Sequence, residues 1–206
     1  MVKAYAVIFV FWGLYRIIFR LPEELEETFL KPLVFVGAVM FVERPAGIGQ
    51  YFLDVWGRGH WLKALAGGWF FGLGYVIFYA LASLLAFTKL EFSSELNSQT
   101  WMSLVGIGTL TAIWEEWTFS GYILKKLSAV SKSPWLPRLV TSFLFALIHL
   151  PILVFWYKFT GGVVLFQLVL LFILGVGNTI LMGFSKNLLA PIISHILWGI
   201  AIFLFR

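Results

Sequence analysis

The chain has 206 residues, of which 61% are hydrophobic and only 12% are charged. Soluble domains carry about 25% charged residues, so this composition is typical of a protein that crosses a membrane several times. At about 20 residues per span, the length allows roughly seven spans with short loops and leaves no room for a separate soluble domain. We therefore predict an all-α, polytopic membrane helical bundle that forms a single domain over residues 1–206.

Composition also excludes several classes of site. The sequence contains no cysteine, which rules out disulfides, thiol nucleophiles and cysteine-bound metals. The net charge of +5 is spread over the predicted loops, and no basic run is interleaved with aromatic residues. We expect membrane lipid as a partner and no binding to nucleic acid.

Apolar segments suited to cross a membrane follow one another along the chain. They cover residues of about 4–20, 28–42, 65–88, 101–124, 138–157, 161–184 and 188–205. The connector Glu23–Glu27 is acidic, and we expect it to be a solvated helical turn. The segment Tyr51–Trp61 mixes charged and aromatic residues and predicts an amphipathic piece at the membrane interface.

Seven spans divide the loops into two sets, which share the basic residues unequally. One set holds Lys3, Arg44, Arg58, Lys63, Lys125, Lys126, Lys132, Arg138 and Lys186. The other holds Arg20, Lys31, Lys89, Lys158 and Arg206, together with most of the acidic residues. Because cytoplasmic loops carry an excess of Lys and Arg, we predict a cytoplasmic amino terminus and an external carboxyl terminus.

Two adjacent glutamates, Glu115 and Glu116, interrupt the apolar segment 101–124. An ionised side chain at bilayer depth costs at least ~2.5 kcal/mol, so the pair indicates a functional site. His149 and His195 also lie in apolar segments. With the predicted orientation, Glu115, His149 and His195 lie roughly 14, 16 and 12 Å from the cytoplasmic ends of their spans. The sequence therefore predicts one buried polar site in the cytoplasmic half of the membrane.

These residue types favour hydrolysis by an activated water molecule. A carboxylate beside an imidazole can take a proton from water, and the resulting hydroxide can attack a carbonyl carbon. A second imidazole can donate a hydrogen bond to the developing oxyanion. Other protease chemistries lack their residues: Asp54 is the only aspartate, no His-Glu-x-x-His motif is present, and Ser120 has no Gly-x-Ser-x-Gly context.

Three motifs in chain order resemble those of the CAAX-processing and bacteriocin-immunity (CPBP) family of glutamate-type intramembrane proteases. Glu115–Gly121 (EEWTFSG) is similar to the first motif, in which two glutamates precede Phe, usually Arg, and Gly. Phe145–His149 (FALIH) resembles the second motif, Phe-x-x-x-His. His195 and Gly199 meet the third motif in part, since the family usually has Asn four positions after this histidine. The resemblance covers residues of about 100–206.

The resemblance implies an intramembrane endopeptidase of a prokaryotic cell membrane. In it Glu115 and His149 would activate the water, and His195 would stabilise the oxyanion. The implied substrate is a peptide or protein, with lipid modification left open, and the chemistry needs no metal and no cofactor.

One departure from the family pattern concerns Glu116. Position 120 is Ser instead of the arginine that usually accompanies this glutamate. Neighbours on a helix point about 100° apart, so Glu116 cannot share the direction of Glu115 and is predicted to be a supporting residue. Two arrangements stay open: a neutral Glu116 bonded to Ser120 four residues on, or an ionised Glu116 paired with Arg16.

The second departure is Gly199, which cannot act as an oxyanion donor. Asn178 in the preceding span is an alternative donor, and Phe145 is expected to pack rather than to take part in the chemistry. Two further functional classes stay open. The chain could be a catalytically silent relative that binds peptides or scaffolds a membrane complex. It could also be a small transporter, although no internal repeat supports that class.

Overall fold

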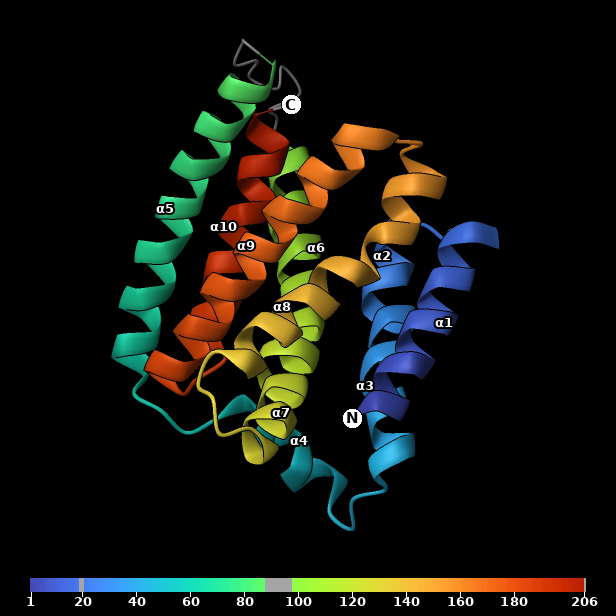
Figure 1. The fold of residues 1–206 in the computed structure, drawn as a ribbon, viewed down its shortest axis with the longest axis vertical. Helices are drawn as coiled ribbons and strands as arrows, with labels where there is room; N and C mark the ends of the chain where they lie inside the picture. The colour runs from blue at the N-terminus through green and yellow to red at the C-terminus, as the bar shows by residue number, and fades with distance from the viewer. Residues whose placement is uncertain (19–20, 88–97, 206) are drawn as a thin grey trace.

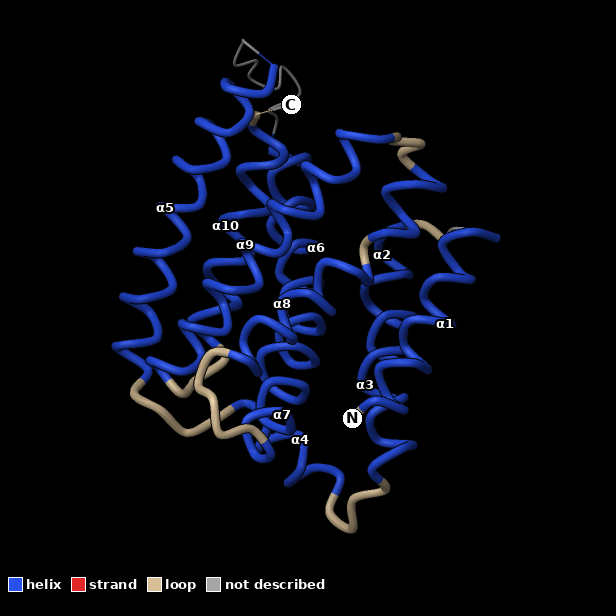
Figure 2. The backbone as a smooth tube through the Cα atoms, in the orientation of Figure 1, coloured by secondary structure: helices blue, strands red, loops and turns tan. Residues whose placement is uncertain are grey.

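The computed structural model describes residues 1–18, 21–87 and 98–205. These residues are almost entirely helical, and no strand occurs among them (Figure 2). The helices in chain order are α1 (Val2–Ile18), α2 (Glu23–Leu25), η1 (Glu26–Leu30), α3 (Lys31–Glu43), α4 (Ile48–Trp56), α5 (Trp61–Phe87), α6 (Ser98–Glu116), η2 (Trp117–Ile123), α7 (Leu124–Val130), α8 (Leu136–Ile148), η3 (Ile152–Trp156), α9 (Gly161–Ser185) and α10 (Leu189–Leu204). The η segments are π-helical turns. The predicted all-α bundle is confirmed.

The helices α5, α9 and α10 are predominantly apolar, which is typical of helices in contact with lipid. Three stretches are long and apolar enough to cross a membrane, Trp61–Leu85, Leu136–Trp156 and Gly161–Ser185, and α10 is a shorter apolar helix. Large side chains such as Phe70 remain exposed on their outer faces. The number of crossings stays a prediction, and the predicted span ends at residues 20 and 88 lie outside the described residues.

The helix α10 lies in the middle of the bundle and packs against α5, α6 and α9, while α8 packs against α9 (Figure 1). The pair α1 and α3 forms the side of the molecule opposite α5, and α1 packs against η3 (Figure 1). The amino terminus lies toward the end that carries α4 and α7, and the carboxyl terminus lies at the other end (Figure 1). The direction of these ends in a membrane stays a prediction. Arg20, Lys89 and Arg206 of the charge comparison lie outside the described residues.

A group of aromatic rings connects α3 to the predicted site. The ring of Phe119 in η2 meets Phe35 of α3 at 6.4 Å and Phe145 of α8 at 5.3 Å between centroids. Both contacts are edge-to-face, the arrangement that aromatic quadrupoles favour. On the other side of η2, a Cβ at Gly121 would lie 2.4 Å from Val55 Cγ1 of α4, so only glycine allows this close approach.

The expectation of a solvated connector is wrong for its second half. Glu23 and Glu24 are exposed, but Glu26 and Glu27 are buried in η1, with exposed fractions of 2% and 5%. Lys31, which the charge comparison placed in an outer loop, is also buried. The physical reason is that η1 runs directly into α3 and packs on α6. In this position Glu26 contacts Arg16 and Glu27 contacts Lys31.

Candidate active site

The three residues predicted to share one depth meet in the interior of the bundle. Glu115 lies near the end of α6, His149 directly follows α8, and His195 lies in the middle of α10. Glu115 Oε2 is 3.6 Å from His149 Nε2 and 3.8 Å from His195 Nε2. Both imidazoles therefore face the same carboxylate oxygen, although the residues come from three separate helices.

His149 is oriented by the helix that precedes it. Its Nδ1 lies 2.8 Å from the carbonyl oxygen of Phe145, which can only accept, so Nδ1 carries the hydrogen. The lone pair of a neutral His149 then lies on Nε2, which faces Glu115. Pro151 follows two residues later, and the chain continues as the π-helical η3, a type of irregularity that is frequent at functional sites.

His195 lies between the two adjacent glutamates. Its Nδ1 is 2.7 Å from Glu116 Oε1, while its Nε2 faces Glu115. The side chains of Glu115 and Glu116 thus point in different directions, as predicted, yet the ring of His195 contacts both carboxylates. Sequence reasoning did not foresee the contact between Glu116 and His195.

Glu116 is surrounded by hydrogen-bond donors. Ser120 Oγ donates to its Oε2 at 2.5 Å, and Asn178 Nδ2 donates to its Oε1 at 2.7 Å. The predicted bond between Glu116 and Ser120 is therefore present. The alternative pairing with Arg16 is wrong, because Arg16 bonds Glu26 in the first connector.

Asn178 uses both ends of its amide within the protein. Its Oδ1 accepts a hydrogen bond from Ser194 at 2.6 Å, and its side chain is buried beside Glu116. This geometry favours a role in holding Glu116 over the donor role that was considered for Asn178.

Lys31 is a site neighbour that sequence reasoning missed. Its Nζ donates to Glu115 Oε1 at 2.9 Å and to Glu27 Oε1 at 2.8 Å. The i,i+4 spacing of Glu27 and Lys31 is a sequence signal for their pairing. The contact with Glu115 joins residues 84 positions apart, which no local pattern reveals.

The two oxygens of Glu115 differ in their surroundings. Oε1 is bonded to Lys31, whereas the buried Oε2 has no direct hydrogen-bond partner among the described residues. Polar atoms separated by slightly more than 3.5 Å are often bridged by a water molecule. The atoms Oε2 of Glu115 and Nε2 of His149 and His195 thus define a point where a water molecule could be held.

This point lies at the wall of a cavity of about 590 Å³. Glu115, His149 and His195 form its polar end, and Leu171 and Trp198 belong to its apolar walls. Such a mixture of apolar walls and a few convergent polar groups is typical of ligand sites.

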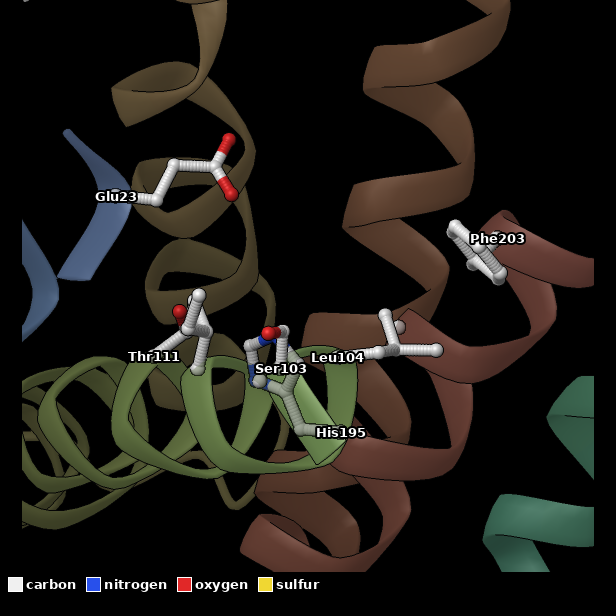
Figure 3. A pocket seen from close by; sticks show the side chains of 9 residues that line it. Glu23, Ser103, Leu104, Thr111, His195 and Phe203 are labelled. Atoms are coloured by element: carbon white, nitrogen blue, oxygen red, sulfur yellow. The ribbon is translucent and has the colours of Figure 1, made fainter. Parts of the chain in front are cut away.

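A second cavity of about 360 Å³ adjoins the first and shares Thr111, His195 and Gly199 with it. Figure 3 shows this second cavity, with Glu23 on one side and Phe203 on another. Two cavities thus meet at His195.

Two further predicted residues also lie at the site. The ring of Phe145 packs against the rings of His149 and His195 at 4.9 and 5.7 Å between centroids, as expected for a packing residue. Gly199 lines both cavities, and a Cβ built on it would meet no atom within 4 Å. Among the residues that the structure describes, no group of three or more His, Asp or Glu side chains has an arrangement that would hold a metal ion.

The fold and the site together define a helical membrane protein with a carboxylate and two imidazoles at the wall of an internal cavity. The chain belongs to the type II CAAX prenyl endopeptidase Rce1-like family, whose model matches residues 97–201. No curated protein and no solved structure matches the chain. The resemblance to the CAAX protease family is thereby confirmed. At the level of the family, the chain is an integral membrane protein of the CAAX-type endopeptidases, which act on peptides or proteins.

Proposed function

We propose that the chain is an active intramembrane endopeptidase in which Glu115 and His149 activate a water molecule and His195 stabilises the oxyanion. The observation that carries the proposal is the convergence of three atoms. Glu115 Oε2 lies 3.6 and 3.8 Å from the Nε2 atoms of His149 and His195, at the wall of a cavity. Both distances are longer than a direct hydrogen bond, so a water molecule placed beside the three atoms can hydrogen-bond to them.

The first step is the activation of water. Glu115 Oε2 and the unprotonated Nε2 of His149 both accept hydrogen bonds, so a water molecule between them is held by both of its hydrogens. Its oxygen lone pair is then free to attack the carbonyl carbon of a peptide in the cavity. As the new carbon–oxygen bond forms, Glu115 takes the water proton, and the carbonyl electrons move to the oxygen.

The second step is the collapse of the tetrahedral intermediate. In its imidazolium form His195 donates from Nδ1 to Glu116, which keeps the ring in place, and donates from the N–H at Nε2 to the oxyanion. The carbon–nitrogen bond then breaks, and the leaving amine receives the proton from Glu115. Glu115 returns to its carboxylate form, so the cycle needs no further reactant.

A second candidate, a catalytically silent relative that binds peptides, is favoured by Ser120 and Gly199. These residues stand where the family usually has Arg and Asn. The missing arginine at position 120 has a substitute, since Ser120, Asn178 and His195 hold Glu116 without it. At position 199 the wall is open.

The test is cleavage of peptides by the purified protein in liposomes. A panel with a farnesylated peptide, its unmodified counterpart and an unrelated apolar peptide is incubated with the wild type and with Glu115→Gln. We expect cleavage of at least one peptide by the wild type, no cleavage by Glu115→Gln, and no effect of a metal chelator. Binding without cleavage by the wild type supports the silent relative instead, and activity lost with chelator and restored by zinc contradicts the proposed mechanism.

A further inference from the structure

Lys31 is the most deeply buried cation in the described part of the chain, with an exposed fraction of 2%. It lies at the first position of α3, outside the family-matched segment, which begins at residue 97. Its Nζ lies 5.4 Å from the centroid of Trp12 and 6.0 Å from that of Phe35, so aromatic rings flank it. A lone buried ammonium is strongly disfavoured, and its two carboxylate partners explain why it is tolerated.

The position of Lys31 is fixed by the segment before it. Trp114 of α6 donates a hydrogen bond from Nε1 to the backbone carbonyl of Glu27 at 2.9 Å, which holds η1 against α6. Glu26, the first residue of η1, is tied to Arg16 and accepts a hydrogen bond from Tyr15 at 2.7 Å. Because η1 continues into α3, these contacts also set the place of Lys31.

The ammonium of Lys31 acts on Glu115 in two ways. Its bond to Oε1 fixes the carboxylate so that Oε2 remains directed at His149 and His195. Its charge favours the ionised form of Glu115, a buried residue that is 4% exposed. The other groups that face Glu115 are the two histidines, and Glu27 faces it across Lys31.

We propose that Lys31 is a positioning residue for Glu115, which it holds ionised and directed at the histidines. This chain thus places a cation next to the first glutamate, while Ser120 stands where the family usually has an arginine beside the second. The inference rests on the proposed function, because it assigns Lys31 to the same water-activating carboxylate.

The decisive comparison is between Glu27→Gln and the double variant Lys31→Met/Glu27→Gln. Glu27→Gln leaves Lys31 and Glu115 as a neutral pair, and we expect it to keep most of the activity. The double variant removes one positive and one negative charge together, so it avoids leaving Glu27 buried alone. Without Lys31, Glu115 loses both orientation and its counter-charge, and we expect kcat to fall about 100-fold.

The pH profile distinguishes this role from a structural one. Removing the cation makes Glu115 bind its proton at higher pH, so the acidic limb of the kcat/KM profile should move to higher pH in the double variant. Lys31→Arg keeps the positive charge, so the acidic limb of its profile should lie close to that of the wild type. A double variant with the rate and the pH profile of Glu27→Gln would overturn the proposal.

An infrared measurement decides the question without activity. At neutral pH we expect the double variant Lys31→Met/Glu27→Gln to show a protonated carboxyl band that Glu27→Gln alone lacks. Adding Glu115→Gln to the double variant should remove this band. Absence of this band in a folded double variant contradicts the role of Lys31. If the wild type cleaves no peptide, the proposed function fails, while the infrared result still tests the inference on Lys31.

Discussion

In the amino-terminal helices, the buried carboxylates Glu26 and Glu27 each bond a cation from those same helices. In the family-matched segment 97–201, Glu115 and Glu116 face imidazoles instead, and one oxygen of Glu115 has no direct hydrogen-bond partner among the described residues. Each buried carboxylate of the first region contacts a cation, which suits a role in packing, although Glu27 shares Lys31 with Glu115 and has one oxygen, Oε2, without a hydrogen-bond partner among the described residues. In the second region Glu115 and both imidazoles line a cavity, which suits a role in chemistry.

The contrast also shows how the two regions depend on each other. Lys31 belongs to the first region by position and reaches Glu115 of the second. The family-matched segment therefore contains the proposed catalytic groups but not all of the charges around them. Variants in each region test this contrast.

The largest effect is expected for His149→Ala in the second region. Loss of a positioned acid–base partner typically lowers the rate by about 10²–10⁴-fold, and the same is expected here for kcat in the peptide assay. His60→Ala is the matched control, because His60 is exposed in the connection before α5. Equal activity of the two variants would remove His149 from the proposed mechanism.

A somewhat smaller effect is expected for His195→Ala. Removal of one oxyanion donor lowers kcat by about 10²–10³-fold, and KM should change little because the interaction forms mainly in the transition state. Steady-state kinetics on folded protein measure both constants. A change in KM with unaltered kcat would indicate that His195 binds the substrate rather than the transition state.

In the first region we expect loss of stability instead of loss of catalysis. Arg16→Met leaves Glu26 buried without its cation, which should lower the free energy of unfolding by about 3–5 kcal/mol. Arg16→Met/Glu26→Gln should recover most of this loss in thermal unfolding experiments in detergent. The activity per folded molecule should match the wild type in the double variant, because the bond from Trp114 still holds η1 against α6. A rate loss in the double variant would contradict a purely structural pair.

At Gly199 the site has room for a donor that this chain lacks. A Cβ there meets no atom within 4 Å, so Gly199→Asn should fold normally with its amide in the cavity. We expect kcat to rise by about tenfold, less than the 10²–10³-fold that an optimally placed donor provides. Gly199→Ala is the control, and an equal gain with Ala would show that the amide is not responsible.

The smallest effect is expected at Glu43, the last residue of α3, just beyond the predicted span 28–42. Burial tends to raise the pKa of Glu43, but hydrogen bonds from Lys126 at 2.7 Å and Tyr122 at 2.5 Å outweigh this and lower it. A lowered pKa stabilises the fold above the pKa of the unfolded chain, and this contribution is lost as pH falls through the folded value. Glu43→Gln should therefore flatten the acid side of a plot of melting temperature against pH, and an unchanged slope would contradict it.

Different features of the sequence predicted the helical bundle and the proposed catalytic residues. Long apolar segments predicted the helices directly, since the period and length of such segments suit nothing else in a membrane. Glu115, His149 and His195 were found because charged residues at bilayer depth are rare and because their motifs resemble a family. In the structure the three side chains meet at one site.

The contacts of Lys31 and Glu116 could not be predicted in the same way. Lys31 looked like a loop residue, because only the packing of η1 on α6 brings it to Glu115. Glu116 was expected to lie apart from the histidines, yet the ring of His195 reaches both glutamates. Both cases depend on tertiary contacts between helices far apart in sequence, which single-chain patterns do not contain.

The roles of the two adjacent carboxylates are compared through Glu115→Gln and Glu116→Gln in single-turnover peptide hydrolysis. Glu115 is the proposed base, so its variant should lose about 10²–10⁴-fold in rate. Glu116 acts through His195, and glutamine can still hydrogen-bond that ring, so we expect a loss of only about 10-fold. Retained hydrolysis by Glu115→Gln, or a greater loss with Glu116→Gln, would contradict the central assignment.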